Sequence, residues 1–194
     1  MNTNTTDTQL TVLDLASLRI WKGNPRKTIP DLTDLIASVK RLGVLQPLLV
    51  RPLDYPVPAV DVPAMITHEV VAGQCRFLAA TAAELASVPC TVRDIDDAAA
   101  LEIGLTENAG RSDPHPLEDA EALDALVRQH GRSVEHVADR IGRPAAWVRR
   151  RLSLLKLIPA ARTWLRDGRL PVAHAQQLAA VGADVQARVV ERYK

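Results

Sequence analysis

The sequence predicts an α/β domain followed by an all-α domain. Signals for strands and helices alternate from about residue 10 to residue 110. Only helical patterns follow, over residues 111–194, with no stretch of period two. The charge is divided in a similar way, because the first part of the chain is acidic and the later part is basic. We therefore expect two domains of different architecture that meet near residues 110–116.

In the first domain the early elements are a helix, a strand and a loop. Residues 1–9 are polar and predict a disordered tail. Apolar residues in "DLTDLIASVKRLG", residues 31–43, recur at the helical spacing and stop at a glycine that is typical of a helix end. "GVLQPLLVRP", residues 43–52, then predicts a short buried strand. The prolines of residues 53–64 predict a loop.

Two further strand–helix pairs complete the first domain. "MITHEVVAG", residues 65–73, predicts a strand, and "CRFLAATAAELA", residues 75–86, predicts a helix. "VPCTVRDI", residues 88–95, predicts another strand, and "DAAALEIGLTENAG", residues 97–110, another helix. Since aromatic residues make up only 3% of the chain, we expect Ala, Leu and Val to fill the core.

The second domain opens with an amphipathic helix. "LEDAEALDALVRQHG", residues 117–131, keeps its apolar residues on one side, with Asp113 as the expected N-cap. Four more segments show helical patterns only: "SVEHVADRIG", "PAAWVRRRLSLLKLI", "AARTWLRDG" and "PVAHAQQLAAVG".

Residues 133–155 have the layout of a helix-turn-helix. Ser133 is a good N-cap for the first helix, and Gly142 stands where a tight turn favours a left-handed residue. Pro144 suits the first position of the second helix, whose buried stripe would begin at Val148. Trp147 could belong to the core or line a groove.

A cluster of basic side chains lies on the expected second helix. Residues 128–169 hold 11 Lys and Arg but only 3 Asp and Glu, whereas residues 1–127 hold 10 and 18. Such a basic region indicates contact with a polyanion, although a solvated helical face would give the same pattern. The second helix of a helix-turn-helix enters the DNA major groove, where arginine binds guanine or phosphate. The candidate DNA-binding residues are Ser133, Arg143, Ala145, Arg149, Arg150 and Arg151.

Composition bears on location and on other classes of protein. No apolar run is long enough for a membrane helix, and the N-terminus lacks the regions of a signal peptide. Two cysteines, Cys75 and Cys90, do not make a disulfide framework, so we expect a reducing cytoplasm. The five histidines show no spacing that favours a metal site.

The stretch "VAGQCRFLAA", residues 71–80, places Arg76 at a strand–helix junction. Three interpretations are open: a phosphate cradle, a reactive thiol at Cys75, or an ordinary turn with a solvated arginine. A phosphate cradle is chemically sensible because glycine lets the backbone approach phosphate and a helix N-terminus offers free N–H groups. Arg76 would add a fixed positive charge.

Taken together, the motifs resemble those of ParB-type proteins of chromosome and plasmid partition. The similarity covers about residues 10–182, with six stretches in the expected order: "NPRK", "GVLQPLLVRP", "VVAGQCRFLAA", "ENAGRSDPHPLEDAEAL", the helix-turn-helix and "LRDGRLPVAHAQQL". The resemblance implies a ParB/sulfiredoxin-like α/β domain with a small mixed sheet, then a helical DNA-binding domain. It implies boundaries at residues 10–110 and 111–194.

For the first domain, the resemblance implies binding of CTP with Mg²⁺. The implied nucleotide-binding residues are Asn24, Arg26, Gly73, Gln74, Cys75, Arg76, Glu107, Asn108 and Arg111. Glu107 and Asn108 would hold the metal through the nucleotide and are the candidates for slow CTP hydrolysis. The chain departs from the usual Gly-Glu-Arg-Arg motif at Gln74 and Cys75, and Leu78 replaces a further arginine. Hydrolysis is therefore left open.

For the whole protein, the resemblance implies a homodimer that binds a palindromic, centromere-like DNA site as a CTP-dependent clamp. Its implied partner is a ParA-type ATPase, and its implied place is the nucleoid in the cytoplasm. Two alternatives remain. One is a ParB-related transcriptional repressor of plasmid genes. The other is a sulfiredoxin-like thiol enzyme that would use Cys75.

Overall fold

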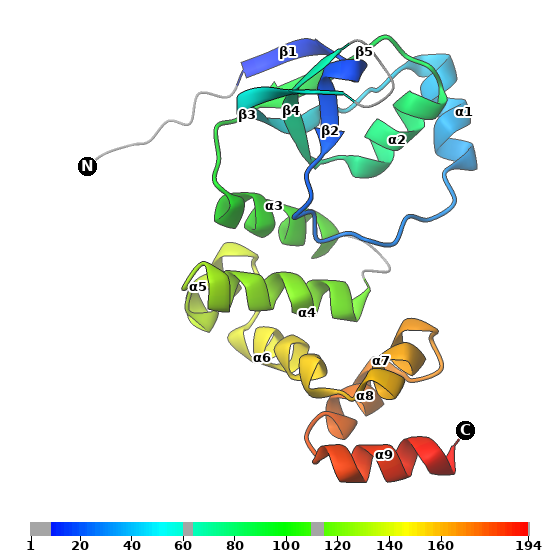
Figure 1. The fold of residues 1–194 in the computed structure, drawn as a ribbon, viewed down its shortest axis with the longest axis vertical. Helices are drawn as coiled ribbons and strands as arrows, with labels where there is room; N and C mark the ends of the chain where they lie inside the picture. The colour runs from blue at the N-terminus through cyan, green and yellow to red at the C-terminus, as the bar shows by residue number, and fades with distance from the viewer. Residues whose placement is uncertain (1–8, 60–63, 110–114, 194) are drawn as a thin grey trace. The chain divides into compact units, whose positions relative to one another are not determined.

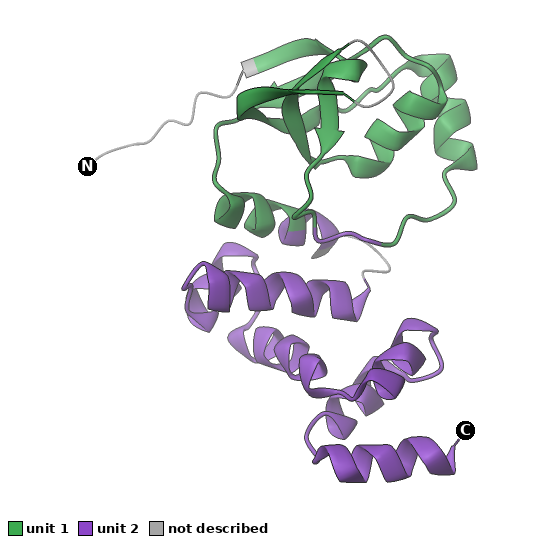
Figure 2. Cartoon of the chain, in the orientation of Figure 1, with its two compact units in different colours: residues 1–24, 28–104 green, residues 25–27, 105–194 purple. Residues whose placement is uncertain are grey.

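The computed structural model of the chain describes residues 9–59, 64–109 and 115–193. The chain forms two compact units, residues 1–24 with 28–104 and residues 25–27 with 105–194 (Figure 2). The first unit is a mixed sheet with helices and the second is helical, which confirms the predicted fold class. The boundary that we predicted between residues 110 and 111 lies outside the described residues.

A five-stranded mixed sheet forms the framework of the first unit (Figure 1). Its strands are β1 (Gln9–Asp14), β2 (Leu18–Ile20), β3 (Leu48–Pro58), β4 (Met65–Ala72) and β5 (Ser87–Val92). They follow the order β1-β5-β3-β4-β2. β1 with β5 and β3 with β4 are antiparallel pairs, whereas β5 with β3 and β4 with β2 are parallel. The small mixed sheet that the resemblance implied is therefore present.

Helices α1 (Thr33–Leu42) and α2 (Gln74–Ala82) lie side by side against one face of the sheet (Figure 1). Helix α3 (Asp97–Ala109) follows β5, and a 3-10 turn, η1 (Leu15–Ser17), joins β1 to β2. Small and branched aliphatic residues fill the space between sheet and helices, as the composition predicted. The buried cluster consists of Leu18, Val39, Val44, Leu48, Val50, Val70, Ala79, Ala80, Val88 and Cys90.

Strand β3 is longer than the sequence suggested. We predicted a loop over residues 53–64, but the strand continues to Pro58, so this prediction is wrong for residues 53–58. The prolines are tolerated because β5 pairs with β3 only over Leu48–Val50, which leaves one edge of the later part of β3 without a ladder. On the other edge the pairing with β4 shifts register between Pro52 and Val57.

The N-terminal strands were missed by the sequence analysis. The predicted tail, residues 1–9, lies outside the described residues except for Gln9, which begins β1 and pairs with Val92. Strand β2 has only three residues, too few for an alternating pattern to be recognised. Both strands gain their hydrogen bonds from partners far along the chain, so local sequence gives little sign of them.

The second unit is built from short helices (Figure 1). They are α4 (Pro116–Asp124), a π-helical turn η2 (Ala125–Gln129), α5 (Val134–Arg140), α6 (Ala145–Ser153), a 3-10 turn η3 (Leu154–Lys156), α7 (Pro159–Arg166), α8 (Val172–Leu178) and α9 (Ala183–Arg192). A buried cluster runs from Leu117 of α4 to Val190 of α9. Gln186 is also buried, and it is satisfied because its side chain accepts from Ile158 N and donates to the carbonyls of Lys156 and Val181.

Two predictions at helix ends need correction. Asp113 was expected to cap the first helix of this unit, but Nδ1 of His115 accepts from Leu117 N at 3.3 Å and His115 is the N-cap. Pro144 is the N-cap of α6 rather than its first helical residue. Asp113 itself lies outside the described residues.

In the ranges that the structure describes, every helix is too short or too polar to cross a membrane.

Candidate functional site

The glycine turn between β4 and α2 has a backbone that only glycine adopts easily. Gly73 has φ 96° and ψ 23°, in the left-handed region, and it is the N-cap of α2. A Cβ built on Gly73 would lie 2.8 Å from Leu48 Cδ2. The backbone conformation therefore favours glycine here, and a larger residue would displace the end of the Leu48 side chain. The turn leaves the first N–H groups of α2 without a side-chain cap, which is the arrangement that suits an anion.

The side chain of Arg76 packs beside this turn and bonds to other residues of the first unit. Its Nη1 donates to the carbonyl oxygens of Gln46 and Pro47, each at 2.8 Å. The same guanidinium lies beside Gly73, since a Cβ built there would be 3.1 Å from Arg76 Nη2. Arg76 thus ties the segment before β3 to the first turn of α2. Of the three interpretations of this stretch, the solvated arginine does not fit, because Arg76 is only partly exposed and has these internal partners.

The two residues between Gly73 and Arg76 carry no charge. Cys75 is buried, with 9% of its surface exposed. Oε1 of Gln74 is also buried and has no hydrogen-bond partner among the described residues. The turn therefore offers one cation, Arg76, together with the backbone N–H groups at the start of α2.

Asn24 is the predicted nucleotide-binding residue that the structure brings close to the turn. It is 6% exposed, and its Nδ2 donates to Val71 O at 3.3 Å, two residues before Gly73. Its backbone N–H donates to Trp21 O at 3.1 Å. Asn24 is therefore a buried, oriented amide beside the end of β4.

The predicted nucleotide-binding residues other than Asn24 and those of the turn at residues 73–76 do not belong to the described part of the first unit. Arg26, Glu107 and Asn108 are part of the second unit, and Arg111 lies outside the described residues. Glu107 and Asn108 occupy the last turn of α3, where Asn108 is 7% exposed. A carboxylate and an amide next to each other can act as oxygen ligands for Mg²⁺ or its waters.

A ladder of charges across the sheet was not foreseen. Arg19 of β2, Glu69 of β4 and Arg51 of β3 stand side by side in the strand register. Both oxygens of Glu69 are used, Oε1 by Arg19 at 2.8 Å and Oε2 by Arg51 at 2.8 Å. Arg51 also pairs with Asp97 at 2.6 Å and lies over the ring of Trp21, 5.0 Å from its centroid. The ladder joins three strands to the start of α3.

Arg51 keeps its charge in spite of its burial. Only 15% of its side chain is exposed, and this desolvation lowers its pKa. The hydrogen bonds and charges of Glu69 and Asp97 act in the opposite direction and prevail, so the pKa of Arg51 is raised above its ordinary value. The sequence gives no local sign of this ladder, because Arg51 and Arg19 are 18 and 50 residues away from Glu69.

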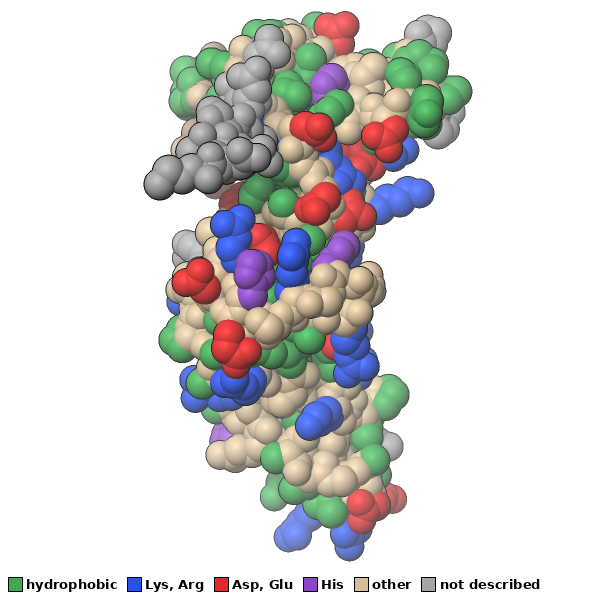
Figure 3. Space-filling view, turned by 90° about the vertical axis from the view of Figure 1, so that its left-hand side faces the viewer, with side chains coloured by type: hydrophobic (Ala, Val, Ile, Leu, Met, Phe, Trp, Pro, Cys, Tyr) green, Lys and Arg blue, Asp and Glu red, His purple; other side chains and the backbone are tan. Residues whose placement is uncertain are grey.

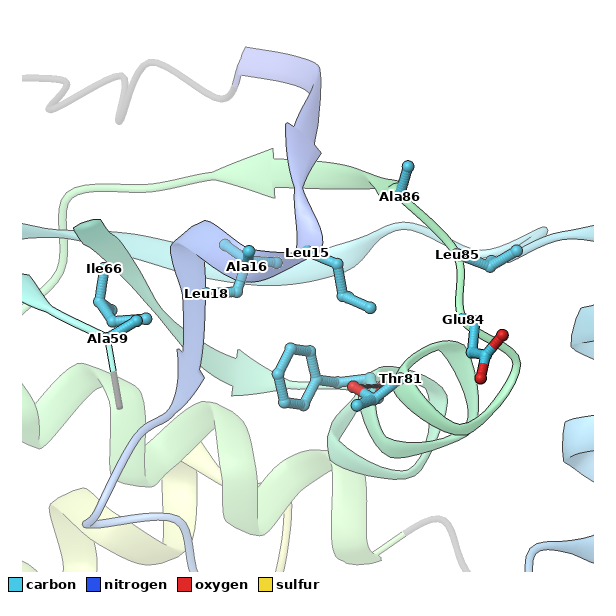
Figure 4. A pocket seen from close by; sticks show the side chains of 10 residues that line it. Leu15, Ala16, Leu18, Ala59, Ile66, Thr81, Glu84, Leu85 and Ala86 are labelled. Atoms are coloured by element: carbon cyan, nitrogen blue, oxygen red, sulfur yellow. Dashed lines mark hydrogen bonds between the residues drawn. The ribbon is translucent and has the colours of Figure 1, made fainter. Parts of the chain in front are cut away.

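An apolar cleft lies elsewhere in the first unit. It has a volume of about 470 Å³ and is lined by Leu15, Leu18, Ile66, Phe77 and neighbouring residues (Figure 4). It opens beside η1 and the later turns of α2, whereas Gly73 and Arg76 are at the first turn of α2. The cleft therefore does not coincide with the glycine turn.

The helix pair α5–α6 has the local geometry that the sequence predicted. Oγ of Ser133 accepts from His136 N at 3.1 Å and caps α5. Gly142 has φ 65°, the left-handed conformation that the tight turn needs. Ala138 and Val148 are buried where the two helices pack. These residues make α5, the turn and α6 a helix-turn-helix.

Three of the predicted arginines lie at the surface of this pair. Arg143, in the turn, and Arg149 and Arg150, on α6, are exposed. Arg149 forms an ion pair with Glu135 of α5 in which both side chains are mostly exposed. Ser133 is exposed and Ala145 is half-buried. Basic side chains, with acidic ones among them, lie over the helical unit on the face drawn in Figure 3.

Arg151 differs from its two neighbours. Only 12% of its side chain is exposed, and its Nε lies 3.3 Å from Oδ2 of Asp119 on α4, which is 5% exposed. Its guanidinium is over the ring of Trp147, 4.9 Å from the centroid, and that of Arg143 is 5.7 Å from the same centroid. The sequence held a signal for this, because Arg151 follows the buried Val148 by three residues and so faces the core side of the helix.

Burial outweighs the attraction within this pair. Desolvation raises the pKa of Asp119 above its ordinary value, and the charge of Arg151 only partly offsets it. Desolvation likewise lowers the pKa of Arg151, against the attraction of Asp119, and the charge of Arg143 lowers it further. The pair therefore links α4 to α6, but its net electrostatic contribution to stability is small.

Two family models cover the chain. The model of the ParB N-terminal domain matches residues 1–109, and that of the ParB HTH domain matches residues 112–193. A probable chromosome-partitioning protein ParB of Xylella fastidiosa is 37% identical over 171 residues, which are 87% of this chain and 52% of that protein. The chromosome-partitioning protein ParB of Caulobacter vibrioides is 39% identical over 163 residues, 83% of this chain and 51% of that protein. The chain thus spans about half the length of these relatives.

Solved structures give the same result. A C-terminally truncated ParB of Caulobacter crescentus, complexed to the centromeric parS site, matches with a TM-score of 0.64 and 30% sequence identity, over 95% of this chain and 93% of that one. The same protein complexed with CTP-gamma-S matches at 33% identity, over 95% and 98% of the two chains, but its TM-score of 0.46 does not support a shared arrangement of the whole chain. From its two matched domains and its relatives, the chain belongs to the family of ParB chromosome-partitioning proteins.

Proposed function

We propose that the chain binds a centromere-like DNA site through α5 and α6 and acts in chromosome or plasmid partition. The observation that carries this proposal is a capped helix-turn-helix whose exposed surface holds Arg143, Arg149 and Arg150. Arginine suits both guanine edges and phosphates, and the second helix of such a pair enters the major groove. The similarity to a ParB complexed to parS supports the same conclusion.

The exposed residues divide into two roles. Arg149 pairs with Glu135 at the surface, and such a pair is weak enough for a phosphate to displace the carboxylate. Arg150 is exposed on the middle of α6, where a side chain can reach base edges. Ser133 and Ala145 stand at the starts of the two helices, where backbone N–H groups and small side chains suit phosphate contacts. Arg151 is assigned to the interior and not to DNA.

Fluorescence anisotropy tests the DNA proposal. We expect the chain to prefer a duplex with the parS site over a scrambled duplex of equal length, and to lose affinity steeply as salt rises. Arg150→Ala should weaken binding to the parS duplex by about 1–3 kcal/mol if this side chain reads a base. Arg188→Ala removes the same charge from an exposed site on α9 and is the matched control. Equal affinity for both duplexes would disprove specific binding.

We further propose that the glycine turn holds the phosphates of CTP with Mg²⁺. The residues fit a phosphate group, because Gly73 leaves no room for a side chain and α2 presents free N–H groups beside the Arg76 guanidinium. Asn24, Gln74 and Cys75 would line the same turn. Arg26, Glu107, Asn108 and Arg111 are the further nucleotide-binding residues of this proposal, and Glu107 and Asn108 are the proposed ligands of the metal. Bound Mg²⁺ would offset the phosphate charge.

Arg76 would serve two purposes in this site. Its Nη1 is occupied by the Gln46 and Pro47 carbonyls, so the remaining N–H groups and the fixed charge are what it can offer a phosphate. Since Cys75 and Gln74 contribute no charge, backbone N–H groups must supply a large share of the binding.

Calorimetry with each of the four nucleoside triphosphates and Mg²⁺, with and without the parS duplex, tests the nucleotide proposal. We expect heat with CTP alone among the four. Arg76→Gln should abolish it, whereas Arg93→Gln, which removes a half-buried arginine of the same unit, should not. Absence of heat with CTP under both conditions would refute the proposal and leave DNA binding untouched.

At the level of the whole protein we propose a homodimer on a palindromic site, closed around DNA by CTP, with slow hydrolysis as a switch and a ParA-type ATPase as partner. Light scattering with a parS duplex, with and without CTP, measures the number of chains on DNA. Phosphate release in the same mixtures measures hydrolysis. We expect two chains per duplex and a release that depends on parS DNA.

A further inference from the structure

Three side chains in the second unit form a connected series that begins in α4 and ends at the turn of the helix-turn-helix. Asp119 of α4 pairs with Arg151 of α6 at 3.3 Å, and the guanidinium of Arg151 lies 4.9 Å from the centroid of Trp147. The guanidinium of Arg143, in the turn before α6, lies 5.7 Å from the same centroid. One indole ring therefore holds two cations, one nearly buried and one exposed.

Two guanidinium groups on one ring repel each other. Each gains from the negative face of the indole, but their like charges oppose this arrangement in a site that water only partly reaches. The carboxylate of Asp119 offsets the inner charge, since it pairs directly with Arg151 and is itself 5% exposed. Asp119 therefore permits Arg143 to remain over Trp147 while Arg151 occupies the interior.

Asp119 can act on the DNA-binding surface only through these neighbours. It belongs to α4, and its exposed fraction of 5% leaves it no contact with a partner molecule. Arg143, in contrast, is exposed and directly precedes α6. A fixed orientation of this side chain lowers the conformational entropy that binding would otherwise remove.

We propose that Asp119 is a positioning residue for DNA binding: through Arg151 and Trp147 it fixes the side chain of Arg143 at the turn of the helix-turn-helix. This inference rests on the proposed DNA-binding function. It assigns to an interior carboxylate of α4 a share of the affinity for the centromere-like site.

The first test needs no DNA. The chain holds three tryptophans, so incorporation of 5-fluorotryptophan gives three ¹⁹F resonances, which single Trp→Phe variants assign. We expect Asp119→Asn to shift the resonance of Trp147 and to leave those of Trp21 and Trp164 in place. Arg151→Lys, which keeps the charge but removes the planar guanidinium from the ring, should shift Trp147 as well. A Trp147 resonance unchanged in Asp119→Asn would overturn the proposal.

The second test is a double-mutant cycle on DNA. We expect Asp119→Asn to weaken binding to a parS duplex by about tenfold, the size of one lost arginine contact. In the Arg143→Ala background the same substitution should change the affinity by less than about twofold, because its effect passes through Arg143. Additive effects would show that Asp119 acts only on the fold, and would overturn the proposal. Asp119→Glu should restore most of the lost affinity.

A matched control separates this effect from a loss of charge on α4. Asp124→Asn lies on the same helix and breaks an exposed pair with Arg128, and we expect it to leave both the Trp147 resonance and the DNA affinity unchanged. If the wild-type chain binds the parS and the scrambled duplex with equal affinity, and Arg150→Ala does the same, the proposed DNA-binding function is wrong. The ¹⁹F result then still decides whether Asp119 positions Trp147.

Discussion

Arg51 in the sheet unit and Arg151 in the helical unit occupy closely matched sites. Their side chains are 15% and 12% exposed, and each lies over an indole ring, at 5.0 and 4.9 Å from its centroid. Yet the pKa of Arg51 is raised and that of Arg151 is lowered. Desolvation lowers the pKa of both groups and is the largest cause for each, and Arg151 is the more deeply desolvated of the two. The nearby charges differ as well. Arg51 has two carboxylates, whereas Arg151 has one carboxylate and a neighbouring cation, Arg143.

The network around Glu69 is therefore structural, whereas a bound partner can influence the network around Asp119 and Arg151. The ladder around Glu69 satisfies both of its carboxylate oxygens and ties strands to α3. The pair Asp119–Arg151 is poorly compensated, and one of its neighbours is an exposed DNA-binding candidate. A phosphate placed near Arg143 would lower the repulsion that Arg151 experiences. The charge of Arg151, which Asp119 only partly compensates, is thus coupled to the proposed DNA contact of Arg143.

The largest effect that we predict is that of Glu69→Gln. It leaves two arginines without their shared carboxylate, and removal of one partner from a buried ion pair is strongly destabilising. We expect a loss of about 3–5 kcal/mol in the free energy of unfolding, measured by urea denaturation. Arg51 retains Asp97, so a loss well below this range would mean that Asp97 alone can compensate it.

Arg151→Met should destabilise less than Glu69→Gln at pH 7, because the carboxylate left behind can take up a proton. The pKa of Asp119 is already raised by burial, and removal of Arg151 raises it further. A raised folded pKa means that the contribution of Asp119 to stability is present below its unfolded pKa of about 3.9 and is lost as pH rises through the folded value. Urea denaturation at several pH values should therefore show the destabilisation shrinking as pH falls. A loss that grows toward low pH would contradict this account.

Asp119→Leu combined with Arg151→Met should restore much of that loss. The double variant removes two desolvated charges and leaves no unpaired group, so we expect a stability within about 1 kcal/mol of wild type. The matching double variant of the ladder is not available, because Glu69 serves two arginines at once. Thermal and urea denaturation of the single and double variants give the coupling energy between Asp119 and Arg151.

The sequence predicts well those features that depend on neighbours along the chain. The cap at Ser133, the left-handed Gly142 and the strand–glycine–helix junction at Gly73 all follow from local rules, and the structure has each of them. The alternation of elements also predicted the α/β and all-α units. These features are local because a cap or a turn is complete within a few residues.

Features that depend on strand register could not be predicted from the sequence. Arg19, Arg51 and Glu69 meet only because β2, β4 and β3 pair in one register, and β3 continues through prolines only because its other edge is open. Arg151 is an intermediate case. The spacing from Val148 placed it on the buried side of α6, but its partner Asp119 comes from another helix, and the run of three arginines suggested a common role.

The smallest effect that we predict is that of Asp124→Asn, which breaks an ion pair that is exposed rather than buried. Asp124 pairs with Arg128 at 2.7 Å, closer than Asp119 to Arg151, but the arginine side chain is 78% exposed. Solvent and salt screen such a pair, and exposed pairs spaced by four residues on a helix contribute about 0.3–0.5 kcal/mol. We expect urea denaturation to show a loss no larger than this, which should vanish in high salt. A loss comparable with that of Arg151→Met would mean that distance, and not desolvation, determines what these ion pairs contribute.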